Sequence, residues 1–207
     1  MSYHIYNTDG IVLKRVNFGE SNALFYILTA DLGLIISSAQ AVRSHLSKLN
    51  SALQEYSLVT LSCVKGKNGW KLVNAVAKEN FFFDLAHTAQ RVVSQIALSL
   101  LRMIPGEQKH PEIFSIVAGG FSALKKFSEN PGNIGREHQA LTDSFEILMM
   151  LRILHHLGYL EKNRQTEKFL QIGNIGSGWD EKILSEILVA KSELVKLINQ
   201  GLQESQL

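Results

Sequence analysis

Cysteine is nearly absent from this chain of 207 residues, and long apolar runs are absent altogether. The single cysteine, Cys63, has no second cysteine with which to form an internal disulfide, as is usual for proteins of a reducing compartment. No run of about 18 apolar residues occurs, so no membrane-spanning helix is predicted. The polar start, Met-Ser-Tyr-His-Ile-Tyr, lacks the apolar core of a signal peptide. We therefore expect a cytoplasmic protein.

Motifs for catalysis, metal binding and nucleotide binding are also missing. The seven histidines include no pair at the i, i+4 spacing, and no Cys-x-x-Cys occurs, so no metal site is predicted. No Gly-x-Ser-x-Gly motif is present, and Gly19-Glu20-Ser21 is more typical of a turn between strands than of a catalytic acid and nucleophile. The glycine-rich stretch 173–178 lacks a following Gly-Lys-Ser/Thr, which favours a flexible connection over a phosphate-binding loop. We predict no catalytic residues, no cofactor and no metal, and thus a protein that is not an enzyme.

Five short segments rich in apolar and β-branched residues predict strands in the first part of the chain. The strongest local signal is Asn68-Gly69, which predicts a tight hairpin between the last two strands. A polar stretch with a helical turn, residues 43–52, follows the third strand. This order is typical of an OB-fold, a five-stranded Greek-key barrel, although the pattern leaves a five-stranded open sheet as an alternative. The predicted strands are residues 11–18, 22–29, 34–42, 56–65 and 70–77.

The hydrophobic period changes from two to about 3.6 after Phe81-Phe82-Phe83, which is typical of helices. We expect the three phenylalanines to pack the barrel against the helices. Gly119-Gly120 lies inside the second predicted helix and indicates close approach of another backbone. The prediction is an α+β chain of two domains, with an OB-fold at residues 1–80 and an all-α helical domain at residues 81–207. The apolar stripes fall within residues 93–104, 113–127, 141–157 and 184–202.

Basic side chains are in excess in the predicted barrel. Residues 1–83 have eight lysines and arginines against five acids, whereas the remainder has a net charge of −1. Such a surface can meet a polyanion, because lysine and arginine neutralise phosphates and an aromatic ring stacks on any base. The alternative is a solvated surface with Trp70 as a core anchor, and composition alone favours it. The candidate nucleic-acid-binding residues are Lys14, Arg15, Arg43, Lys48, Lys65, Lys67, Trp70 and Lys71.

A series of short motifs runs through the same region. They are Thr8-Asp9-Gly10-Ile11-Val12-Leu13-Lys14, Gly19-Glu20-Ser21, Thr29, Gly33, Ala39, Arg43, Ser47-Lys48-Leu49 and Leu53-Gln54-Glu55-Tyr56. This order resembles the amino-terminal domain of the RecO family of bacterial recombination mediators, closely over residues 5–80 and more loosely over the helical remainder. One position departs from the family pattern, because Ala41 stands where the family usually has glycine. Alanine resists positive φ whereas glycine does not, so the backbone conformation at this position is open.

The resemblance implies a DNA repair protein of the cytoplasm, associated with the nucleoid, that works without catalysis. It implies contacts from the barrel to single- and double-stranded DNA, annealing of complementary strands and, with RecR, loading of RecA onto strands coated by single-stranded DNA-binding protein. A basic surface is compatible with annealing, because it screens the repulsion between two polyanions. A charge of +3 is weak for a DNA-binding barrel, and the alternative is an OB-fold scaffold that docks proteins without contacting DNA.

The resemblance also implies two properties of the helical domain. The acidic, apolar-ended tail of single-stranded DNA-binding protein is expected to bind there, in a pocket that pairs an apolar floor with one or two cations. The alternative is that these cations belong to solvated helix faces. Many members of the family carry a four-cysteine zinc site in this domain, but residues 84–207 contain no cysteine, so no zinc site is expected. The candidate partner-binding residues are Arg91, Arg102, Lys125, Lys126, Arg136 and Arg152.

Overall fold

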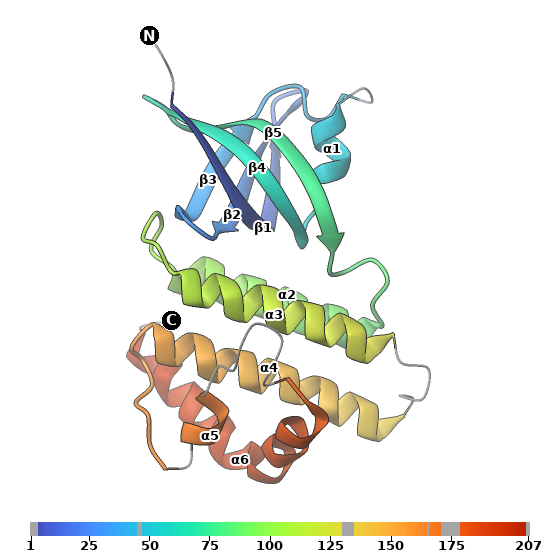
Figure 1. The fold of residues 1–207 in the computed structure, drawn as a ribbon, viewed down its shortest axis with the longest axis vertical. Coiled ribbons are helices and arrows are strands. Elements are labelled where there is room, and N and C mark those ends of the chain that lie inside the picture. The colour runs from blue at the N-terminus through green and yellow to red at the C-terminus, as the bar shows by residue number, and fades with distance from the viewer. Residues whose placement is uncertain (1–3, 45–46, 130–134, 165, 171–178, 206–207) are drawn as a thin grey trace. The chain divides into compact units, whose positions relative to one another are not determined.

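The structure is a computed structural model that describes residues 4–44, 47–129, 135–164, 166–170 and 179–205. The described chain begins with strands and continues with helices, and one short helix lies between the third and fourth strands (Figure 1). The glycine-rich connection that the sequence predicts at residues 173–178 lies outside the described residues.

The five strands close into a barrel in the order β1-β2-β3-β5-β4. All neighbouring pairs are antiparallel except β3 and β5, whose parallel pairing joins Ser37 to Trp70 and closes the barrel. The predicted OB-fold is therefore confirmed, and the open sheet is excluded. The hairpin at Asn68-Gly69 is also confirmed, with Gly69 at φ +94°. The elements are β1 (Ile5–Phe18), β2 (Asn22–Thr29), β3 (Gly33–Ala39), α1 (Lys48–Ala52), β4 (Ser57–Gly66) and β5 (Gly69–Asn80).

The first strand is longer than the sequence predicts, because it serves two neighbours. Its first half, from Ile5 to Ile11, pairs with β4, and its second half pairs with β2. The register shifts between Val12 and Lys14, where an irregularity lets the strand turn from one neighbour to the other. A side chain at Gly10 would come within 2.6 Å of Ile27, so the close approach of the strands requires glycine here.

Alternating side chains from all five strands fill the barrel interior. Burial of each large apolar side chain contributes about 1.5–3 kcal/mol, so this layer accounts for much of the stability of the barrel. Cys63 is part of it, and burial raises the pKa of its thiol to about 11. The core includes Val12, Phe25, Ile27, Ile35, Val42, Leu53, Val59, Leu61, Cys63, Trp70 and Leu72.

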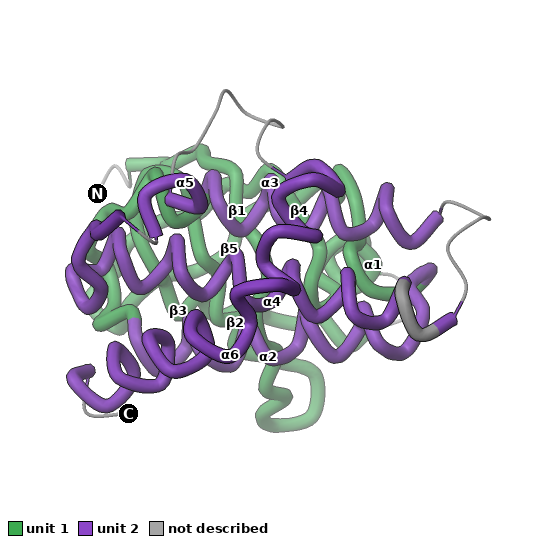
Figure 2. Tube along the Cα trace, turned by 90° about the horizontal axis from the view of Figure 1, so that it is seen from below, with its two compact units in different colours: residues 1–83, 104–114 green, residues 84–103, 115–207 purple. Residues whose placement is uncertain are grey.

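A segment from later in the chain completes the barrel unit. Residues 1–83 and 104–114 form one compact unit, which Figure 2 colours green. The backbone N–H of Leu34 donates to the carbonyl of Gly106 at 2.9 Å, and Lys65 forms an ion pair with Glu107 at 2.5 Å. Gly33 has φ +76°, and a side chain there would meet the carbonyl of Gln108 at 2.3 Å. The turn between β2 and β3 thus depends on glycine both for its conformation and for the contact.

The second unit, residues 84–103 and 115–207, is helical in its described part. Helices α4 and α6 pack along each other, and α2 packs on α4. Gly120 allows this core to close, because a side chain there would lie 2.8 Å from the sulfur of Met149 and 2.9 Å from the ring of Trp179. No helix in the described residues is long and apolar enough to cross a membrane. The helices are α2 (His87–Met103), α3 (Pro111–Ser128), α4 (Arg136–His156), α5 (Glu167–Leu170) and α6 (Glu181–Glu204).

Candidate nucleic-acid interface

Three of the candidate cations lie on or near α1: Arg15 is on β1, Arg43 is in the loop before α1, and Lys48 begins α1. Arg15 is held in place by two amide oxygens, since its Nη1 donates to Asn50 of α1 at 2.9 Å and its Nε donates to Asn17 at 3.0 Å. Arg43 is exposed and donates to the carbonyl of Gly19 at 3.2 Å. Lys48 is exposed at the start of α1. These hydrogen bonds fix two guanidinium groups without neutralising their charge.

The other lysines lie on the barrel wall and its hairpin. Lys14 pairs in register with Tyr26 of β2, and its ammonium lies 6.0 Å from the centre of that ring. Lys71 lies beside Ser38 of β3. Lys65 and Lys67 lie at the tight hairpin between β4 and β5. All four lysines are exposed, and they lie on β1, β4, β5 and the hairpin rather than on α1.

Ion pairing separates the cations of the barrel into two sets. Lys78 binds Asp9 at 2.8 Å and Lys65 binds Glu107, and these hydrogen bonds hold the pKa of both carboxyl groups below their usual values. The second set makes no ion pair with an acid of the described residues. Its charges are therefore available to the phosphates of a polyanion. This set contains Lys14, Arg15, Arg43, Lys48, Lys67 and Lys71.

Trp70 differs from the other candidates because it is only 5% exposed. Its ring packs in the barrel core and meets Tyr6 edge to face, with the ring centres 5.1 Å apart. The ammonium of Lys65 covers the ring at 5.3 Å. A buried indole offers no free face to a base, so the structure favours the alternative in which Trp70 is a core anchor.

Ala41 keeps the conformation that the family pattern associates with glycine. Its φ is +51°, in the left-handed region, and its backbone N–H donates to the side chain of Asn22 at 3.1 Å. Two residues on, the backbone N–H of Arg43 donates to the carbonyl of Ser21 at 3.0 Å. The loop that presents Arg43 therefore holds Ala41 in a left-handed conformation that is strained for alanine.

A hollow of about 560 Å³ lies on the barrel unit near Arg15, and the sequence analysis did not anticipate it. Of the three phenylalanines expected to pack between the domains, Phe81 is buried, Phe82 is partly buried and Phe83 is 63% exposed. The packing of these phenylalanines between the barrel and the helices stays a prediction. A run of identical aromatic residues gives no signal that the three rings point in different directions. The lining residues are Arg15, Asn17, Gln54, Glu55, Tyr56, Phe82 and Phe83.

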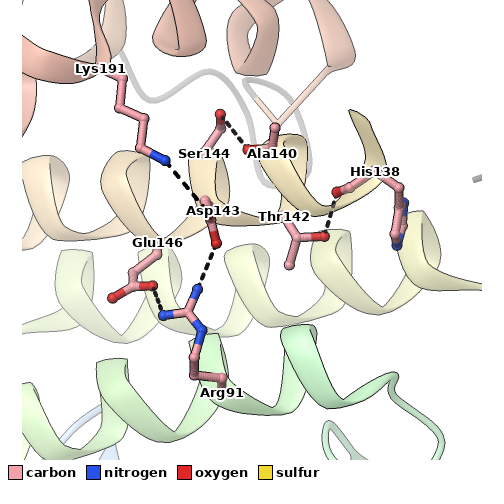
Figure 3. A network of polar contacts seen from close by, with 8 residues as sticks. All are labelled: Arg91, His138, Ala140, Thr142, Asp143, Ser144, Glu146 and Lys191. Atoms are coloured by element: carbon pink, nitrogen blue, oxygen red, sulfur yellow. Dashed lines mark hydrogen bonds and ion pairs between the residues drawn. The ribbon is translucent and has the colours of Figure 1, made fainter. Parts of the chain in front are cut away.

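Arg91, a candidate partner-binding residue of the helical unit, is already engaged. Its guanidinium binds Asp143 at 2.6 Å and Glu146 at 2.8 Å, and Lys191 of α6 reaches the other oxygen of Asp143 at 3.4 Å (Figure 3). The network ties α2, α4 and α6 together. An acidic peptide would have to compete with two carboxylates for Arg91, which argues against a docking role.

Arg152 is the most buried of these cations, with 1% of its surface exposed. Its Nε donates to the carbonyl of Phe169 at 2.9 Å, and its guanidinium lies 4.5 Å from the centre of the Trp179 ring. Burial lowers its pKa to about 10, so it remains charged at neutral pH. A side chain so enclosed cannot reach a partner, and the structure makes Arg152 a packing residue instead.

The remaining candidates differ in exposure. Arg102 and Lys126 are exposed, Lys125 is partly buried, and the side chain of Arg136 lies outside the described residues. Two hollows of the helical unit, of about 270 and 310 Å³, are lined by none of these cations; each has glutamate at its edge instead. The structure therefore does not combine an apolar floor with a candidate cation in either hollow.

The residues of this chain do not fit a four-cysteine zinc site. The only cysteine is buried in the barrel core, and the described residues contain no group of three histidine, cysteine or acidic side chains placed to hold a metal ion.

The closed barrel with an interrupting helix after its third strand is an OB-fold, the fold class the strand pattern predicts. Residues 1–80 match the family model described as "Recombination protein O N terminal". The amino-terminal domain therefore belongs to the RecO family, as the order of its motifs predicts.

Curated relatives support this assignment. The chain is 29% identical over 143 residues to the DNA repair protein RecO of Caldicellulosiruptor saccharolyticus, covering 69% of this chain and 55% of the relative. It is 31% identical over 116 residues to the DNA repair protein RecO of Gloeothece citriformis, and the match covers 54% of this chain and 40% of that relative. The match to the protein of Caldicellulosiruptor bescii is 26% identical over 162 residues and covers 78% and 62%. The chain thus spans roughly half the length of these relatives.

Proposed function

We propose that this chain is a DNA repair protein of the RecO type that acts in recombination by binding DNA rather than by catalysis. The observation that carries the proposal is the set of six barrel cations without an acidic partner among the described residues, on a domain of the RecO family. Binding of a DNA strand releases counterions from its phosphates, so each cation that contacts a phosphate adds to the salt dependence. These cation contacts are open to both single- and double-stranded DNA, since phosphates are common to both.

The test is the salt dependence of affinity for a single-stranded oligonucleotide. The double variant Arg43→Ala with Lys48→Ala should reduce the slope of log affinity against log salt by about 1.4, because each lost phosphate contact removes about 0.7. The matched control is Lys162→Ala with Lys168→Ala, which changes the net charge equally but removes lysines already paired with Glu167 and Glu186. An affinity of the wild-type chain that does not change with salt would contradict DNA binding and favour the scaffold alternative.

We further propose the finer activities of the family for this chain. The barrel anneals complementary strands by screening their repulsion and, with RecR, helps to load RecA onto strands coated by single-stranded DNA-binding protein. Annealing of two oligonucleotides, followed with and without single-stranded DNA-binding protein and without any nucleotide, tests the first step. Annealing that needs ATP would contradict the non-catalytic mechanism.

The proposed contact with the tail of single-stranded DNA-binding protein is best supported at α2. Leu98 is 47% exposed there, and Arg102 follows it by one helical turn on the same face. An apolar side chain beside a cation suits a peptide that is acidic and ends in an apolar residue. Titration of the full chain with the tail peptide should give a dissociation constant in the micromolar range, and Arg102→Glu should abolish binding. Unchanged binding by this variant would exclude α2 as the site.

A further inference from the structure

A hollow on the barrel unit combines aromatic rings, a fixed cation and amide groups. Tyr56 and Phe82 stack on each other with their ring centres 4.8 Å apart, and the exposed ring of Phe83 lies on the same lining. The hollow has a volume of about 560 Å³, which is within the range of about 300–1,000 Å³ that is usual for ligand sites. An exposed phenylalanine at the edge of such a hollow offers an apolar face that water solvates poorly.

The backbone around the hollow is held in an unusual conformation. Tyr56 has φ +64°, which is uncommon for a residue with a large side chain and strains its backbone. Its N–H donates to the carbonyl of Val12 at 2.7 Å, and its carbonyl accepts from the N–H of Phe81 at 3.1 Å. The strained residue is thus fixed from both sides, and its ring is directed onto Phe82.

Asn80 connects the two segments that form the hollow. Its Nδ2 donates to the carbonyl of Glu55 at 3.1 Å and to the hydroxyl of Ser57 at 2.9 Å. Its Oδ1 accepts from the backbone N–H groups of Phe82 at 2.9 Å and Phe83 at 3.2 Å. The side chain of Asn80 therefore fixes the distance between residues 55–57 and residues 82–83.

Polar groups of defined direction surround the rings. The guanidinium of Arg15 is fixed by Asn17 and Asn50, and these amide bonds leave its charge uncompensated. One oxygen of Glu55 accepts from the backbone N–H of Arg15 at 2.8 Å, and a carboxylate has a second oxygen with which to accept a hydrogen bond. The hollow can thus offer a stacking surface, a phosphate-binding cation and an acceptor for the amino group of a base.

We propose that this hollow receives an unpaired base of a single DNA strand, which stacks on Phe83 while Arg15 binds a neighbouring phosphate. The inference rests on the proposed DNA-binding function and adds a base-specific component to it. Phosphate contacts alone cannot distinguish a single strand from a duplex, whereas a stacking site accepts only a base that is free of its partner. The site would therefore make the barrel prefer single strands.

The test compares two labelled oligonucleotides of equal length, oligo-dT and an oligomer of abasic residues with the same number of phosphates, by fluorescence anisotropy with the full chain. Base stacking contributes about 1–3 kcal/mol per base, so the wild-type chain should bind oligo-dT at least about fivefold more tightly than the abasic oligomer. Phe83→Ala should abolish this preference and leave affinity for the abasic oligomer unchanged. Phe83→Trp should retain the preference, because the indole also stacks.

The matched control is Phe18→Ala, which removes another exposed phenylalanine, 42% exposed, that does not line the hollow. It should leave both affinities unchanged. Equal binding of the two oligomers by the wild-type chain, or a loss by Phe83→Ala that is equal for both, would overturn the stacking site while DNA binding stands. Failure of the wild-type chain to bind either oligomer would instead overturn the proposed function. Circular dichroism of each variant checks that it is folded before the affinities are compared.

Discussion

Ala41 illustrates how a single residue can keep a conformation that its side chain disfavours. Its positive φ is imposed by its surroundings, because the N–H of Ala41 and the N–H of Arg43 both donate to the segment around Ser21 and Asn22. The left-handed region costs an alanine about 1–2 kcal/mol. The loop that carries Arg43 is thus maintained at the expense of some stability.

Ala41→Gly should therefore stabilise the protein. Relief of the strain exceeds the extra chain entropy of glycine, about 0.5–1 kcal/mol, so we expect a gain of up to about 1 kcal/mol. Urea unfolding measures it. Ala190→Gly in the middle of α6 is the matched control, since the same substitution in a helix should cost about 1 kcal/mol. A loss of stability in Ala41→Gly would mean that the loop is not strained.

Single residues also show which parts of the site could be predicted from sequence. The Asn68-Gly69 hairpin follows from turn chemistry that acts between neighbours, and it is found where expected. The burial of Trp70 and Arg152 depends on contacts with residues far along the chain, which no local pattern contains. Gly120 was expected to face another backbone, but the close neighbours are the side chains of Met149 and Trp179.

Among the elements, α4, α5 and the start of α6 are joined through Arg152. A buried cation is stable here because the carbonyl of Phe169 accepts a hydrogen bond from its Nε and the face of Trp179 attracts its charge. The sequence alone does not distinguish this arginine from the other cations on helix faces, because its burial depends on residues that lie far from it in the chain.

Arg152→Ala should destabilise the helical unit strongly. Loss of a charge-assisted hydrogen bond and of a desolvated cation–π contact predicts about 3 kcal/mol, measured by urea unfolding. Arg102→Ala is the matched control, because Arg102 is exposed on α2 and its removal should change stability by less than about 0.5 kcal/mol. Equal effects of the two substitutions would contradict the packing role of Arg152.

The strands show a similar division between local and long-range information. Strands β2 and β4 were predicted within a residue or two of their observed bounds, because each alternates regularly. The first half of β1 was missed, since it is defined by pairing with β4 some 50 residues later rather than by its own pattern. The hollow near Arg15 was missed for the same reason, because its lining combines residues 15–17, 54–56 and 82–83.

For the whole molecule, we predict that folding requires no metal. Residues 84–207 contain no cysteine, and the described part of the chain groups no set of metal ligands. Incubation with a chelator should leave the melting temperature unchanged, and elemental analysis of the purified protein should find no stoichiometric zinc. A chelator that lowers the melting temperature would reveal a metal site and contradict this prediction.

The division into domains at residues 1–80 and 81–207 stays a proposal. The two compact units of the structure differ from it at residues 104–114. The barrel unit contains residues 104–114, which the sequence analysis assigned to the helical domain. Local periodicity marks the ends of helices, but it cannot show that the connection between two helices returns to an earlier strand.

This return of residues 104–114 has a consequence for the order in which the protein matures. During synthesis the five strands emerge first. Gly33, Leu34 and Lys65 contact residues 106–108, which are synthesised only after α2. The barrel is therefore completed late. Its completion closes a loop of the chain that contains α2. A fragment ending at residue 83 should unfold at lower urea concentration than one ending at residue 114, as measured by circular dichroism. Fragments of equal stability would show that residues 104–114 do not stabilise the strands. If the shorter fragment is less stable, the newly made barrel is exposed to chaperones and proteases until residues 104–114 have been synthesised.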